Sequence, residues 1–139
     1  MPKYELIDHT ADLGIRVKAE TLEDLFVQSA LAMFDVMAQK IKEYKPSDIT
    51  VKKIKLEAFD ENELLFDWLS ALVYLSDAKK LVFVDFHVEQ LSETILKVAA
   101  KGVSKDFFNI ERDIKAVTYH QLEISKNNQG YQVEVIFDL

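Results

Sequence analysis

The chain has 139 residues, of which 49% are hydrophobic and 29% charged, and its formal net charge at pH 7 is −7. This composition is typical of a globular protein, and the length predicts one domain over residues 1–139. The absence of cysteine excludes disulfides, thiolate metal sites and a thiol nucleophile, and the acidic balance excludes strong nucleic-acid binding based mainly on phosphate contacts.

Hydrophobic periodicity predicts three strands and two helices in the first 80 residues. Alternating apolar residues predict strands over residues 3–8, 13–19 and 49–59. The alternation slips at Lys52 and Lys53, which predicts a β-bulge. Apolar residues spaced by three and four predict amphipathic helices over residues 21–39 and 61–79. Thr21 and Asp60 precede these helices as N-caps.

The second half reads as strands and turns. Alternation predicts strands over residues 81–88, 94–101, 114–125 and 131–139, with a turn at 126–130. Gly102 is predicted to end the second of these strands, and residues 104–113 are predicted to form a loop with a short turn. The element order predicts an α+β fold of two layers, in which two amphipathic helices cover a mixed, mostly antiparallel sheet.

Recognisable catalytic motifs are absent from the sequence. There is no Gly-x-Ser-x-Gly elbow, and the three glycines are too scattered for a phosphate-binding loop. The three histidines lack zinc spacing, and His87 is expected to be a solvent-facing strand residue. No apolar run approaches the roughly 20 residues of a membrane helix, and the N-terminus lacks the apolar core of a signal peptide. We therefore expect a cytoplasmic protein with no catalytic residue and no membrane contact.

Two carboxylates stand where predicted strands end. Asp12 precedes the strand at 13–19, and Asp138 follows the alternation of the last strand, beside the terminal carboxylate of Leu139. Each aspartate alone has a structural explanation, as a turn residue or a strand-end residue. If the two strands are neighbours, three carboxylates converge, and such a cluster requires a cation or protons to offset its repulsion. An all-oxygen site of this kind favours Ca²⁺ or Mg²⁺.

Three basic or titratable residues lie in or near the same segments. Lys115 shares a predicted strand face with Val117 and Tyr119. Its ammonium either reaches solvent from a surface position or points at the acidic cluster, and the sequence leaves both open. His9 lies in the turn before Asp12, and His120 follows the Lys115 strand.

Four segments together resemble the archease family: His9-Thr10-Ala11-Asp12 with Gly14-Ile15, Trp68-Leu69 with Leu72 and Tyr74, Ile114-Lys115-Ala116-Val117-Thr118-Tyr119-His120, and Val135-Ile136-Phe137-Asp138-Leu139. The resemblance covers essentially the whole chain. It implies a small α+β protein that is not itself an enzyme and assists an RtcB-type RNA ligase in tRNA splicing or RNA repair. Such proteins promote guanylylation of the ligase histidine, permit multiple turnover and broaden nucleotide use.

The resemblance also implies particular site residues. It assigns a bound divalent cation to Asp12, Asp138 and Leu139, with Ca²⁺ preferred and Mg²⁺ or Mn²⁺ as alternatives. It assigns a functional role to Lys115, and with His9 and His120 this lysine forms the expected partner-activating surface. One departure concerns residues 102–113, which are shorter and lack the acidic, Arg-His-containing segment usual in the family.

Two other functions remain as alternatives. A general chaperone needs exposed apolar surface, for which Phe107 and Phe108 are the candidates. A metal-dependent hydrolase needs a general base beside the metal and an open coordination position.

Overall fold

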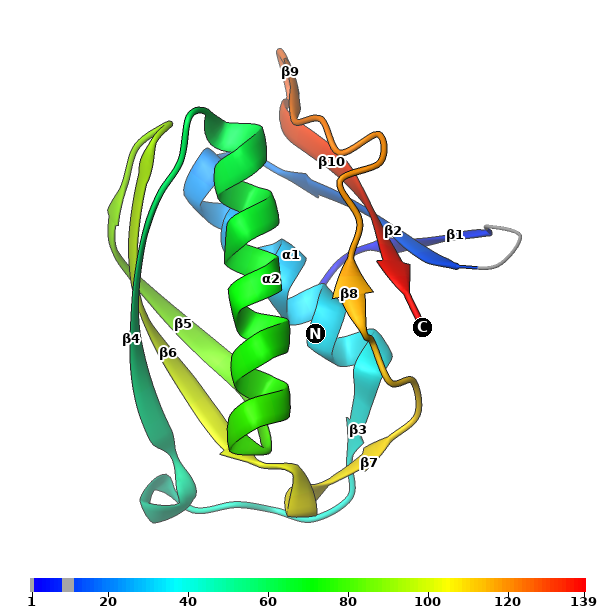
Figure 1. Cartoon of the computed structure of the whole chain (residues 1–139), viewed down its shortest axis with the longest axis vertical. Helices are drawn as coiled ribbons and strands as arrows, with labels where there is room; N and C mark the ends of the chain where they lie inside the picture. Colours follow the sequence, from blue (N-terminus) through cyan, green and yellow to red (C-terminus); the bar gives the residue numbers. More distant parts are fainter. Residues whose placement is uncertain (1, 9–11) are drawn as a thin grey trace.

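A computed structural model describes residues 2–8 and 12–139 of the chain (Figure 1). The described part contains two α-helices, α1 (Leu22–Met37) and α2 (Glu61–Lys79), and two 3₁₀ turns, η1 (Pro46–Asp48) and η2 (Lys105–Phe107). Its strands are β1 (Glu5–Asp8), β2 (Leu13–Ala19), β3 (Ala38–Lys40), β4 (Thr50–Glu57), β5 (Leu81–Leu91), β6 (Ile95–Ser104), β7 (Phe108–Ile110), β8 (Ala116–Val117), β9 (Ser125–Asn127) and β10 (Gly130–Asp138).

The strands form three antiparallel sheets. One has the order β1-β2-β10-β8, with β9 also paired to β10, another has the order β4-β6-β5, and β3 pairs with β7. The predicted α+β class with two helices is confirmed, whereas the single mixed sheet is divided into separate sheets without a parallel pair in the described residues. The reason is that α1 contacts both β2 and β5, so the helices fill the space between the two larger sheets (Figure 1).

The helices begin at the predicted caps. The Thr21 hydroxyl accepts from the Asp24 N–H at 3.0 Å, and the Asp60 carboxylate accepts from the Glu63 N–H at 2.9 Å. The range of α2 is the predicted one, but α1 ends two residues early. Residues Ala38–Lys40 leave the helix because they form the ladder with β7.

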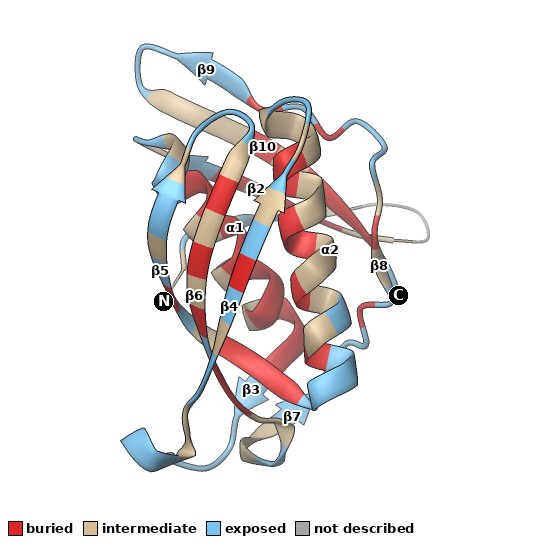
Figure 2. Ribbon diagram, turned by 60° about the vertical axis from the view of Figure 1, so that its left-hand side comes forward, coloured by how far each residue is buried: buried red, intermediate tan, exposed pale blue. Residues whose placement is uncertain are grey.

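Trp68 connects the two helices with the three-stranded sheet. Its indole N–H donates to the Phe26 carbonyl of α1 at 3.1 Å, and its ring meets Phe86 of β5 edge to face, with centroids 5.3 Å apart. The side chain is 1% exposed, and buried residues continue from it along both helices and the inner sheet faces (Figure 2). The described residues 2–8 and 12–139 include no helix with the length and apolar character needed to span a membrane.

Two strand predictions are wrong. The β4–β6 register runs without a shift through Lys52 and Lys53, and the irregularities lie in β5 instead. Lys52 lies near the start of β4, on the inward face of the strand, and is half-buried. A lysine can occupy such a position, so the break in the apolar alternation does not require a bulge. Gly102 lies inside β6, where a Cβ would come within 3.1 Å of Leu81 and 3.2 Å of Phe83. Its missing side chain therefore makes room for two apolar side chains of the neighbouring strand.

The predicted strand at 114–125 is also wrong over most of its length. Within this range only β8 and the first residue of β9 form β-ladders. Between them Gln121 has a φ of 56°, which interrupts an extended strand. The Ile124 N–H donates to the Asn62 side chain at 2.8 Å, so the first turn of α2 holds this segment. The turn before β10 ends at Gly130, whose φ is 126° and where a Cβ would overlap the Ala19 carbonyl.

We predict that Trp68→Phe lowers the free energy of unfolding by about 2 to 4 kcal/mol, because it leaves the buried Phe26 carbonyl without its donor and removes packed volume. Urea denaturation measures the change. Tyr74→Phe on the same helix is the control, since this side chain is 71% exposed and its change should stay within about 0.5 kcal/mol. Equal losses in the two variants would contradict the role given to the indole bond.

Candidate functional site

The pairing of β2 with β10 brings the two ends of the chain together. Its register runs from Tyr131 opposite Ala19 to Phe137 opposite Leu13. The ladder ends at this pair, so Asp138 of β10 and Asp12, the residue before β2, follow it at the same end of the sheet. We call this end of the β2–β10 pair, with Asp12, Asp138 and Leu139, the acidic end.

Asp12 and Asp138 belong to the face of the sheet turned away from the core. Ile15, Val135 and Phe137 point inward and are fully buried, and the residues that alternate with them point outward. Asp138 is exposed and Asp12 half-buried. The two carboxylates can therefore be reached from solvent.

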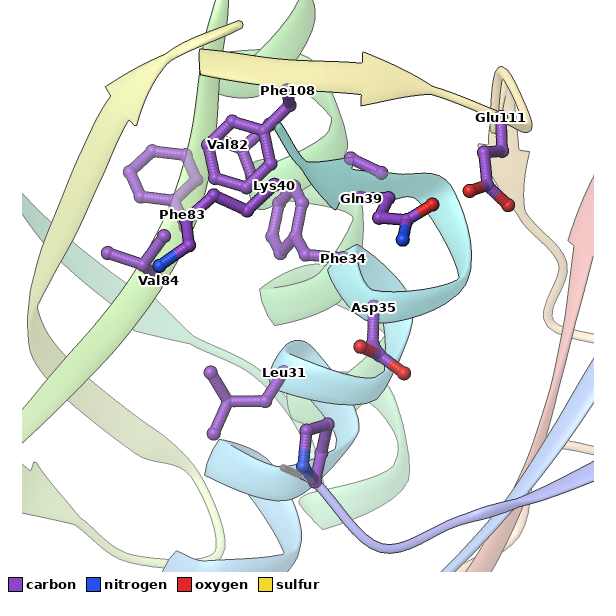
Figure 3. A pocket seen from close by; sticks show the side chains of 12 residues that line it. Leu31, Phe34, Asp35, Gln39, Lys40, Val82, Phe83, Val84, Phe108 and Glu111 are labelled. Carbon is purple, nitrogen blue, oxygen red and sulfur yellow. The ribbon is translucent and has the colours of Figure 1, made fainter. Parts of the chain in front are cut away.

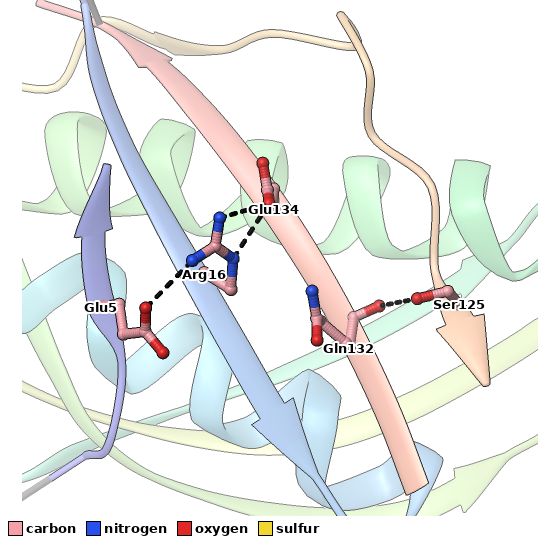
Figure 4. Close-up of polar contacts among 5 residues, drawn as sticks. All are labelled: Glu5, Arg16, Ser125, Gln132 and Glu134. Atoms are coloured by element: carbon pink, nitrogen blue, oxygen red, sulfur yellow. Dashed lines mark hydrogen bonds and ion pairs between the residues drawn. The ribbon is translucent and has the colours of Figure 1, made fainter. Parts of the chain in front are cut away.

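An ion-pair network occupies the middle of the same outer face (Figure 4). The Arg16 Nε of β2 donates to Glu134 of β10 at 3.0 Å, and its Nη1 donates to Glu5 of β1 at 3.0 Å. These two carboxylates raise the pKa of Arg16 further and keep it charged. Arg16 thus bridges three neighbouring strands.

A close apolar contact separates this network from the acidic end. Gly14 lies opposite both Ile136 and Ile7. A Cβ on Gly14 would lie 2.9 Å from the Ile136 Cδ1 and 3.2 Å from the Ile7 Cβ. Because glycine has no side chain, the side chains of Ile136 and Ile7 can lie over Gly14. This contact is next to the last pair of the ladder, Leu13 and Phe137.

β8 adds Lys115 to the acidic end. Ala116 pairs with Asp138, and the Lys115 N–H donates to the Asp138 carbonyl at 2.8 Å. The register places Lys115 beside Leu139, and the lysine side chain is exposed. The topology therefore brings three of the sequence-predicted residues, Asp138, Leu139 and Lys115, onto adjoining backbone.

The two histidines of the expected partner-activating surface are placed differently. The Thr118 N–H donates to the Ile136 carbonyl, so the chain leaves Asp138 as it proceeds from β8 towards His120. His120 itself is exposed in a turn. His9 lies outside the described residues. His87 is exposed on β5, as the sequence predicts.

The donors at the acidic end suit a hard cation. Asp12 and Asp138 supply carboxylate oxygens, and Leu139 is 48% exposed and adds backbone oxygen. Residues 2–8 and 12–139 contain no group of three or more His, Cys, Asp or Glu side chains placed to hold a metal, so a backbone oxygen or water must complete any coordination. Oxygen-only ligation with exposed positions is typical of Ca²⁺ and Mg²⁺.

A separate cavity of about 500 Å³ lies between the end of α1, β3, β5 and β7 (Figure 3). Phe34, Phe83 and Phe108 form apolar walls, and Asp35 lies at its edge. The Tyr4 phenol donates to Asp35 at 2.6 Å, and burial together with this bond raises the pKa of Tyr4 to about 12. None of the described sequence-predicted site residues lines this cavity.

Of the two apolar residues expected for a chaperone, Phe107 packs against neighbours and Phe108 lines the cavity just described. Phe107 and Phe108 are both half-buried. The Phe107 ring meets Tyr44 edge to face at 6.2 Å, and the Lys42 ammonium lies 4.7 Å from its centroid.

Sequence reasoning missed a groove of about 450 Å³ between α2 and β8, which Lys115 also lines. Tyr74 and Asp77 of α2 and Asp113 before β8 lie along it. The sequence did contain a signal for this groove. Tyr74 and Asp77 are three residues apart and therefore share one face of the helix, and this face mixes aromatic and charged side chains.

Comparison with known proteins identifies relatives of the whole chain. The Archease protein family matches residues 4–139. The chain is 38% identical to the protein archease of Methanosarcina barkeri, over 99% of this chain and 96% of that protein, and 38% identical to that of Pyrococcus furiosus, over 94% and 93%.

Two solved structures share the fold. The solution structure of Methanobacterium thermoautotrophicum protein 1598 is 30% identical, with a TM-score of 0.76 and full coverage of both chains. The crystal structure of an archease from Thermotoga maritima, described as a possible chaperone, is 20% identical, with a TM-score of 0.67 over 97% of this chain and 96% of that one. The second likeness concerns the fold alone.

We predict that Gly14→Ala lowers the free energy of unfolding by about 1 to 3 kcal/mol, because its methyl group crowds Ile136 and Ile7. In an Ile136→Ala background the same change should cost measurably less. Chemical denaturation of the four members of this double-mutant cycle gives the coupling. A cost that is the same in both backgrounds would show that the Ile136 contact does not set the requirement for glycine.

Proposed function

Because the chain belongs to the archease family, we propose that it is a cytoplasmic, non-catalytic activator of an RtcB-type RNA ligase. It promotes guanylylation of the ligase histidine, permits multiple turnover and broadens nucleotide use. The observation that supports the proposal is the β2–β10 ladder, which ends at the pair Leu13 and Phe137 directly next to Asp12 and Asp138, together with the bond from the Lys115 N–H to the Asp138 carbonyl.

The proposed cation ligands are Asp12, Asp138 and a backbone oxygen of Leu139. Ca²⁺ is the preferred ion, with Mg²⁺ or Mn²⁺ as alternatives, because all donors are oxygen atoms. A divalent cation held by these residues would supply positive charge to offset phosphate charge during nucleotidyl transfer. The exposure of Asp138 and Leu139 supports this role, since a group that acts on a partner must be reachable from outside.

Lys115, next to the acidic end, is proposed to contact the partner. The Lys115 ammonium is exposed beside this end and can pair with a phosphate or carboxylate of the ligase. The formal net charge of −7 complements a basic nucleotide-handling site and raises the association rate at low ionic strength. In this proposal the protein acts through its partner and catalyses no reaction of its own.

The chaperone and hydrolase alternatives have weaker support. Phe107 is half-buried against Tyr44 and Lys42, which leaves little apolar surface there for unfolded clients. A hydrolase needs a base next to the metal, and the only histidine predicted near Asp12 is His9, which lies outside the described residues.

We predict that wild-type protein binds one Ca²⁺, and that Asp12→Asn and Asp138→Asn each weaken this binding about tenfold or more, because each removes a charged ligand. Isothermal titration calorimetry measures the affinity. Glu134→Gln is the matched control, since this carboxylate lies on the same sheet face but is paired with Arg16. Ca²⁺ binding that survives unchanged in both aspartate variants would sink the metal assignment.

We further predict that Asp12→Ala, Asp138→Ala and Lys115→Ala each remove activation of the cognate ligase in a single-turnover guanylylation assay. Their stability should change by roughly 1 kcal/mol or less, because Asp138 and Lys115 are exposed and Asp12 is only half-buried. Lys18→Ala is the control, an exposed lysine farther along β2.

Thermal melts of each variant separate loss of function from loss of fold. Full activation by the two aspartate variants contradicts the proposed site. Loss of activation by Lys18→Ala as well would point to a general effect of charge instead.

A further inference from the structure

The groove between α2 and β8 is the most developed concave surface next to the acidic end. Its volume is about 450 Å³, and its walls are mainly apolar. The apolar lining residues come from α2 and from the β8 segment: Phe66, Val73, Ile114, Ala116 and Val117. We call this surface the α2–β8 groove.

Carboxylates lie at both ends of the α2–β8 groove. Asp77 and Asp113 line one end, and both are exposed. At the other end the Tyr119 ring packs against Phe66 in a tilted arrangement, with centroids 4.9 Å apart and an interplanar angle of 54°. On α2, Glu63 lies one turn before Phe66 and Asp67 directly after it, so carboxylates lie near this end too. Burial raises the pKa of Tyr119, and the charges of Asp60, Glu63 and Asp67 raise it further.

Exposed aromatic rings accompany these charges. Tyr74 is 71% exposed and Tyr119 is 47% exposed. Aromatic rings beside carboxylates bind arginine and lysine side chains through cation–π contact and ion pairing together. The same carboxylates repel nucleic-acid phosphate. Lys115 is the one basic residue that lines the groove, and its backbone is bonded to Asp138.

The dimensions indicate the length of the ligand. Phe66 and Asp77 are eleven residues apart on α2, which is about 16 Å at 1.5 Å per residue. An extended chain covers that length with about five residues. β8 is the terminal strand in the order β1-β2-β10-β8, so its edge away from β10 is not used by another strand of the described residues. An extended segment can pair with such an edge.

We propose that the α2–β8 groove binds an extended segment of about five residues from the partner ligase, with basic side chains at its ends and apolar side chains between them. This inference rests on the proposed function, which supplies the partner. Docking here would hold the ligase next to the acidic end, because Ala116 of the groove wall pairs with Asp138.

Fluorescence anisotropy with a labelled, end-blocked pentapeptide Arg-Ile-Val-Ile-Arg tests the groove directly. We expect the full chain to bind it, and the double variant Asp77→Lys, Asp113→Lys to bind about tenfold more weakly at low salt. The matched control is Glu20→Lys, Glu93→Lys, which makes the same net charge change at two exposed positions outside the groove lining. Equal binding by both double variants overturns the proposal.

The same variants are then titrated against the ligase. We expect the groove variant to bind the ligase about tenfold more weakly but to activate it at saturating concentration, whereas Asp12→Ala binds normally and does not activate. Unchanged ligase affinity in the groove variant overturns the docking inference and leaves the proposed function intact. If wild type neither binds nor activates the ligase, the proposed function fails, and the docking inference that rests on it is overturned too.

Two further outcomes assign the groove to another ligand and overturn the proposal. One is self-association of wild type in sedimentation equilibrium that the groove variant abolishes, which identifies a second copy of the chain as the occupant. The other is displacement of the pentapeptide by a single-stranded RNA oligonucleotide under conditions where salt of the same ionic strength does not displace it.

Discussion

The antiparallel pairing of β2 with β10 is the constraint on which the rest of the molecule depends. It joins residues near the two ends of the chain, as the bond from Arg16 to Glu134 illustrates across 118 positions of sequence. Every other strand of that sheet is attached to one of these two, with β1 on β2 and both β8 and β9 on β10. The acidic end, Lys115 and one wall of the α2–β8 groove therefore share one backbone frame.

The two faces of the β2–β10 pair differ in composition and in what they contact. The inner face packs against α1 with fully buried side chains such as Ile15 and Val135. The outer face carries the Arg16 ion pairs, the Gly14–Ile136 contact and then Asp12 and Asp138 in succession. Because strand side chains alternate, polar groups can line one face without disturbing the core on the other.

α2 combines a structural and an exposed face in the same way. Trp68 packs inward against Phe26 and Phe86, whereas Tyr74 and Asp77 line the groove on the side of β8. The inward face fixes the helix, so the position of the groove follows from core packing. A rigid helix beside a short edge strand is a suitable surface for an extended ligand.

The sequence by itself determined the features that depend on neighbours within one turn or one strand. The caps at Thr21 and Asp60, the range of α2 and the strand at 13–19 were predicted correctly because their signals are local. Only the tertiary structure decided the features set by distant partners. The division into three sheets, the placement of Gly102 under Leu81 and Phe83, the short β8 and the α2–β8 groove all arise from contacts between segments far apart in sequence. The location of Asp12 and Asp138 at one end of the same sheet lies between these cases. Both carboxylates are visible in the sequence, whereas the β2–β10 pairing that brings their strands together is a long-range contact.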